Sequence, residues 1–193
     1  MRLHTLFVLS LTVCLCAGIA RAAELKNDRW RVEIDPATLA TRATTAGGLN
    51  VALSAPREAG KVESVKGDDA SASWRLDGFD VACELKGDEL RVEFTSANEG
   101  AFTWPIVDVA SPAKALILPT FEGVYVPADD AEWRAFLVGE SPMNTTAGLS
   151  MPFWGLDVGD HTITYILPNA FNNELAITDA GGSLRMALTH EFT

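Results

Sequence analysis

Apolar and polar residues alternate one by one along most of this chain, and this pattern predicts β-strands. A strand with one buried face has an apolar side chain at every second position. Strands are therefore expected at 30–34, 49–53, 73–76, 79–85, 90–94, 102–106, 114–118, 148–156, 161–167, 175–178 and 184–189. Glycine-rich turn signals such as Asp77-Gly78 separate neighbouring strands and are typical of hairpins. The sequence thus predicts an all-β fold, a large antiparallel β-sandwich over residues 23–193.

Two positions in these strands carry further expectations. Pro105 has no N–H to donate to a sheet, so its strand is expected at an edge or a bend. Cys83 falls in phase with the apolar residues Val81 and Leu85, which indicates a small core residue and not a reactive thiol.

The connection from Leu118 to Trp154 departs from the alternation. It gathers prolines, glycines, acids and two tryptophans, and a long irregular connection usually carries function. Within it, the acids of Asp129-Asp130 precede a short helical pattern, and an aspartate there caps free backbone N–H groups. One short helix is therefore expected near residues 129–137.

The N-terminus predicts export. Arg2 gives a charged start, residues 6–20 are almost entirely apolar, and Ala20-Arg21-Ala22 has the small-x-small form that signal peptidase cuts. The apolar run is shorter than the roughly 20 residues that span a bilayer. Residues 1–22 are therefore expected to be a cleaved signal peptide, which leaves a secreted or periplasmic protein with no membrane anchor.

Charge and cysteine content narrow the possible partners. Cleavage removes two of the 15 basic residues and none of the 26 acidic ones, so the exported chain is strongly acidic. Nucleic acid is an improbable partner, because binding it requires neutralisation of phosphates. Only Cys83 survives cleavage, so no internal disulfide and no cysteine zinc site is expected. The two remaining histidines, His161 and His190, lack metal-site spacing, and no cofactor motif is found.

The connection also carries a resemblance to a known family, in the segments Leu118-Pro119, Glu122-Gly123, 125–130 with Trp133, and 149–155. These resemble the N-terminal domain of large bacterial glycoside hydrolases similar to the endo-α-N-acetylgalactosaminidase family. The resemblance implies a galactose-mutarotase-like supersandwich that precedes a (β/α)₈ barrel, and the barrel carries the catalytic carboxylates. This chain stops before any barrel, so a truncated domain without catalytic residues is implied. It would support or dock against that barrel and associate with a carbohydrate or glycan.

Five residues of the connection are candidates for carbohydrate binding or for the domain interface: Glu122, Asp129, Asp130, Trp133 and Trp154. Carboxylates hydrogen-bond sugar hydroxyls, and tryptophan rings stack on sugar rings. Helix capping by the aspartates and core packing by the tryptophans are the structural alternatives. If a barrel docks here, an exposed apolar patch is expected from Met151, Phe153, Trp133 and Trp154.

Two other functions fit the same residues. A mutarotase-type carbohydrate epimerase needs a histidine acid and a carboxylate base across one sugar ring, and His161 with Glu122 or Asp129 is the pair available. A free-standing periplasmic carbohydrate-binding or structural protein needs no chemistry at all.

Overall fold

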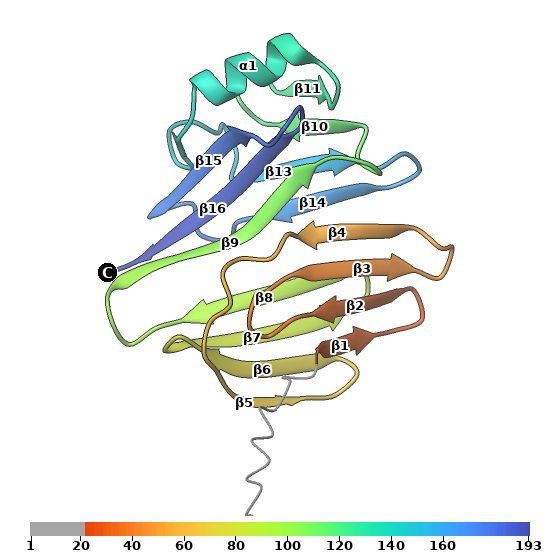
Figure 1. Ribbon diagram of the computed structural model, residues 1–193, viewed down its shortest axis with the longest axis vertical. Coiled ribbons are helices and arrows are strands. Elements are labelled where there is room, and N and C mark those ends of the chain that lie inside the picture. The colour runs from red at the N-terminus through yellow and green to blue at the C-terminus, as the bar shows by residue number, and fades with distance from the viewer. Residues whose placement is uncertain (1–21) are drawn as a thin grey trace, which may run out of the picture.

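The computed structural model describes residues 22–193, so the signal-peptide prediction falls almost wholly outside the described residues (Figure 1). The described part is 53% strand and 5% helix. It is mostly β, as the alternation predicts. Its single helix, α1, is too short to cross a membrane.

The chain forms sixteen strands and α1. In order they are β1 (Ala23–Lys26), β2 (Trp30–Ile34), β3 (Thr41–Thr45), β4 (Asn50–Ser54), β5 (Val62–Gly67), β6 (Ser71–Leu76), β7 (Phe79–Lys86), β8 (Glu89–Thr95), β9 (Gly100–Val109), β10 (Ala115–Leu118), β11 (Val124–Pro127), α1 (Ala131–Gly139), β12 (Met143–Asn144), β13 (Phe153–Asp157), β14 (Thr162–Ile166), β15 (Asn173–Asp179) and β16 (Leu184–Phe192).

The predicted large β-sandwich is wrong, and with it the mutarotase-like supersandwich that the resemblance implied. The strands form four separate four-stranded sheets, ordered β1-β2-β3-β4, β5-β6-β7-β8, β12-β15-β16-β9 and β11-β10-β13-β14. These small sheets take the arrangement of a four-bladed β-propeller. Alternation sets which face of a strand is buried, but it does not set which strand lies beside it. The same pattern therefore fits several small sheets as well as two large ones.

Each of the first two sheets is a meander of consecutive antiparallel strands, and together they occupy the lower half of Figure 1. The hairpin between β6 and β7 turns at Asp77 and Gly78, whose φ angles are +52° and +91°. Aspartate and glycine tolerate this left-handed conformation, which a two-residue hairpin requires. The hairpin predicted at this position is confirmed.

The other two sheets draw their strands from distant parts of the chain. β9 pairs with β16, and β10 pairs with β13 across the whole of the long connection. β9 is the edge strand of its sheet, and its pairing with β16 shifts register between Ala187 and Thr189. Pro105 lies on β9 at this irregularity, where no ladder hydrogen bond is needed from it. The edge position expected for Pro105 is confirmed.

An aromatic cluster joins the β5–β8 sheet to the sheet that contains β9. Phe102 of β9 is only 3% exposed, and its ring centroid lies 4.8 Å from that of Phe79 and 4.6 Å from that of Phe94. The guanidinium of Arg57 lies 4.5 Å above the Phe102 ring, in the geometry of a cation–π contact. Phe102 is therefore part of the packing between the two halves of the molecule.

Cys83 lies on β7 and is buried with an exposure of 3%. Burial raises the pKa of its thiol to about 12, because the thiolate is poorly solvated there. The prediction of a core cysteine is confirmed.

Candidate functional site

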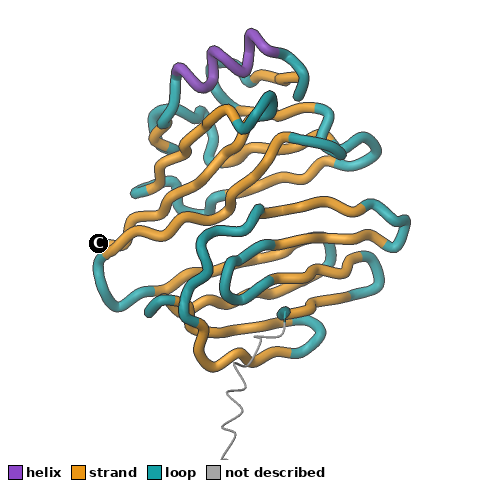
Figure 2. Tube along the Cα trace, viewed as in Figure 1, coloured by secondary structure: helices purple, strands orange, loops and turns teal. Residues whose placement is uncertain are grey.

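Helix α1 lies on the outside of the molecule, at the end away from the first two sheets (Figure 2). Asp130 caps its N-terminus, because its carboxylate accepts hydrogen bonds of 3.0 Å from the N–H groups of Glu132 and Trp133. Leu137 is fully buried and packs the inner face of the helix against the core. The helix predicted near 129–137 is confirmed, and its outward face is left open to solvent.

Three aromatic rings meet at this face. The Trp133 and Phe136 rings stand edge to face with centroids 5.5 Å apart, and the Phe121 ring lies 6.3 Å from that of Phe136. Phe121 is 68% exposed and Phe136 is 41% exposed, while Trp133 is half-buried. We call Phe121, Trp133 and Phe136 the aromatic surface.

The backbone holds Phe121 outward in an unfavourable conformation. Phe121 has φ = +55°, and the turn is closed by a 2.8 Å hydrogen bond from the Gly123 N–H to the Thr120 carbonyl. The Ser150 hydroxyl also donates to the carbonyls of Pro119 and Phe121, which ties the turn to the far end of the connection. Left-handed φ disfavours a bulky side chain, and such strain clusters at functional sites.

The five candidate residues are placed differently. Glu122 and Asp129 are exposed beside the aromatic surface, while the Asp130 carboxylate is engaged in the helix cap. Trp133 belongs to the aromatic surface. Trp154 does not, because it is fully buried on β13 and stacks on Tyr165 with an interplanar angle of 10°. Its rings therefore offer no face to a ligand or to a docking domain, and its role is core packing.

The apolar patch expected for a docked barrel is present only in part. Met151 is 54% exposed and Phe153 is half-buried, but Trp154 has no exposed surface. The exposed large apolar side chains in this region therefore lie at Phe121, Tyr125, Phe136 and Met151, which is a different set from the one the sequence indicated.

The histidines make no acid–base pair with the candidate acids. His161 is exposed and packs edge-on against Trp30, and within residues 22–193 no hydrogen bond or ion pair joins it to Glu122 or Asp129. His190 is half-buried, and its ring nitrogens lie 2.7 Å from the Asn173 side-chain oxygen and 2.8 Å from the Trp104 carbonyl oxygen. Burial lowers the His190 pKa. These contacts give His190 a structural role between strands.

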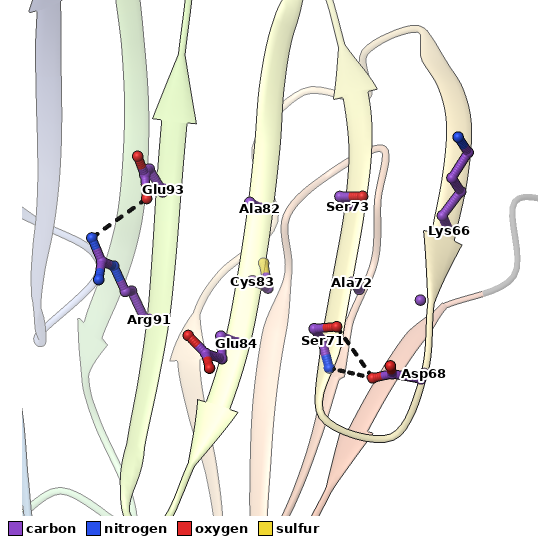
Figure 3. Close-up of a pocket in the computed structure, with 11 residues that line it drawn as sticks. Lys66, Asp68, Ser71, Ala72, Ser73, Ala82, Cys83, Glu84, Arg91 and Glu93 are labelled. Atoms are coloured by element: carbon purple, nitrogen blue, oxygen red, sulfur yellow. Dashed lines mark hydrogen bonds and ion pairs between the residues drawn. The ribbon is translucent and has the colours of Figure 1, made fainter.

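A surface hollow lies elsewhere, on the outer face of the β5–β8 sheet, and has a volume of about 610 Å³ (Figure 3). Small side chains form part of its lining, among them Ser71, Ser73 and Ala82, with charged side chains around them. Two of these charged side chains pair with each other. Arg91 pairs with Glu93 at 3.5 Å.

Asp68, at the other side of this hollow, accepts hydrogen bonds from the N–H groups of Ala70 and Ser71 and from the Ser71 hydroxyl. These bonds lower its pKa, because they stabilise the carboxylate. Among the described residues, the lining contains no histidine to activate a serine. The hollow therefore offers an open surface of small and charged side chains.

No cluster of three metal-ligating side chains is found within residues 22–193. No known protein-family model and no curated protein matches the chain. The aromatic surface is therefore the strongest candidate site on structural grounds.

Sequence reasoning missed Phe121 and Phe136, the two most exposed rings of this surface. A signal for Phe136 exists in the helix pattern, since Leu137 turns inward and the preceding residue then points outward. Phe121 has a weaker signal, namely a phenylalanine in the turn sequence Thr120-Phe121-Glu122-Gly123.

Proposed function

We propose that this protein is a non-catalytic carbohydrate-binding module that is exported from the cell. The ligand binds at the aromatic surface, with the exposed carboxylate of Glu122 beside the rings. The observation that carries the proposal is the exposure of Phe121 in a strained backbone conformation, in contact with a second exposed ring on α1.

Aromatic rings suit sugars for a physical reason. One face of a pyranose ring presents C–H groups that pack on a flat apolar side chain, while the sugar hydroxyls keep hydrogen bonds at the rim. Phe121 and Phe136 supply the apolar rings, and Glu122 and Asp129 supply acceptors for hydroxyl hydrogens. An exposed aromatic cluster without a ligand raises the risk of aggregation, so its presence favours a binding role.

The binding test uses the exported chain against a panel of soluble oligosaccharides and insoluble polysaccharides. Retention on at least one glycan is expected, with loss of affinity of about tenfold or more for Phe121→Ala and for Phe136→Ala, because each removes a stacking ring. Phe171→Ala is the matched control, since Phe171 is 71% exposed and lies outside the aromatic surface.

Retention that the control variant reduces as much as the other two would show non-specific apolar adsorption and refute the site. No binding to any glycan in the panel would refute the function. The same material should release no product from aryl glycosides, and turnover that survives purification would refute a non-catalytic role.

A further inference from the structure

We infer that the sugar bound at the aromatic surface carries positive charge, so that the ligand is an oligosaccharide of amino sugars with free ammonium groups. This inference rests on the proposed function and narrows its ligand class. It comes from the acids that surround the rings.

Two acids flank the exposed ring of Phe136, one in α1 and one at its C-cap. Glu132 precedes Phe136 by four residues and Glu140 follows it by four. Side chains four apart on a helix are neighbours on one face, with Cβ atoms about 5–6 Å apart. Glu132 and Glu140 are both exposed, so the ring lies between two solvated carboxylates. Phe121 has a similar neighbour, because the exposed Glu122 follows it directly.

These charges are not neutralised locally. Across the described residues, Glu122, Asp129, Glu132 and Glu140 take part in no ion pair, whereas many other surface acids of the protein do. The basic residue of α1, Arg134, is half-buried, and its Nε atom is buried and makes no hydrogen bond. With the acids Glu122, Asp129, Glu132 and Glu140 against Arg134, the aromatic surface carries an excess of negative charge.

A positively charged ligand is complementary to this surface in two ways. An ammonium group is attracted both to the face of an aromatic ring and to nearby carboxylates. A neutral sugar uses the rings and hydroxyl hydrogen bonds but gains no attraction between opposite charges, and an acidic or sulfated sugar is repelled. A sugar that presents C–H groups to the rings and ammonium groups to the acids uses both features.

The experiment compares two ligands with the same sugar backbone, one with charged amines and one with neutral acetamido groups. A β-1,4-linked glucosamine hexamer and its fully N-acetylated counterpart are titrated calorimetrically into the exported chain at mildly acidic pH, where the amines of the ligand are protonated. The free amine should bind about tenfold tighter or more, and its affinity should fall with added salt because the attraction is screened.

Charge variants then locate the attraction. Glu132→Gln and Glu140→Gln should each weaken binding of the amine about two- to fivefold, the range for exposed charge pairs, and should leave binding of the acetylated hexamer unchanged. Glu99→Gln is the control, since Glu99 is exposed in the connection between β8 and β9. Circular dichroism checks that each variant keeps its fold.

Each remaining outcome decides between the two proposals. Equal affinity for both hexamers would overturn the charge inference and leave carbohydrate binding intact. If neither hexamer binds but a neutral glycan of the panel does, the charge inference is likewise overturned and carbohydrate binding is left intact. Equally tight binding of a hexalysine peptide would show a general attraction for cations and would also overturn the inference. Failure of every glycan would refute the proposed function itself.

Discussion

Replacement of Phe121 by asparagine separates binding from stability. At φ = +55° a bulky L-residue is strained by roughly 1–2 kcal/mol, whereas asparagine occupies this conformation readily. Asn172, at φ = +59°, is an example in the same chain. The substitution therefore removes most of this strain.

The loss of the ring opposes this gain only partly. Phe121 is 68% exposed, so about a third of its side chain is buried. Complete burial of a phenylalanine contributes about 1.5–3 kcal/mol, so the buried third contributes about 0.5–1 kcal/mol. The net effect of Phe121→Asn is a change of about 0 to 1 kcal/mol in favour of the folded state. For a chain of this size that is a rise in Tm of up to about 2–4 °C.

Thermal and denaturant unfolding measure the change, and Phe171→Asn is the control because Phe171 is equally exposed without a positive φ. The control should show no stabilisation. Binding of glycans should fall about tenfold or more in Phe121→Asn while the protein becomes no less stable. A destabilisation of more than about 1.5 kcal/mol would refute the reasoning, because it would mean that packing of the Phe121 ring stabilises the folded state by more than the backbone strain destabilises it.

Three further predictions concern the rest of the chain. Phe102→Ala should destabilise the protein by about 3–5 kcal/mol in urea unfolding, because it empties the junction between the two halves; a loss below about 1 kcal/mol would contradict this. Cys83 should resist iodoacetamide at pH values well below its pKa of about 12 until the protein unfolds, and labelling of the native protein located by mass spectrometry would refute the assignment. N-terminal sequencing of exported material should start at or near Ala23, whereas an intact Met1 in membranes would argue against cleavage.

Local features of the fold could be predicted because their causes lie within a few residues. The hairpin at Asp77-Gly78, the edge position of Pro105 and the cap at Asp130 each depend on the backbone preferences of one or two residues. The core position of Cys83 follows from the period of one strand. Some strands were missed because they have too few buried apolar residues to give an alternating pattern. Strand β3 has few apolar residues, and every residue of β5 after Val62 is exposed.

The division into four sheets could not be predicted, because it depends on partners far apart in the sequence. Residues of β9 pair with residues of β16 more than 70 positions later, and no local pattern records that choice. Part of the candidate site was missed for a related reason. Trp154 and Phe121 both lie in the long connection, yet one is buried by Tyr165 and the other is turned outward by its backbone. Neither environment is visible from the neighbours in sequence.

The order in which strands find partners has a consequence for biogenesis. Strands β1 to β8 pair only with neighbours in the chain, so each of their sheets can form soon after its residues leave the ribosome or the export channel. Strand β9 must wait for β16, and β10 must wait for β13. During that interval β9 lacks its pairing with β16, so its unpaired edge can be bound by another chain or by a chaperone. The half of the molecule that carries the aromatic surface is thus the last to assemble.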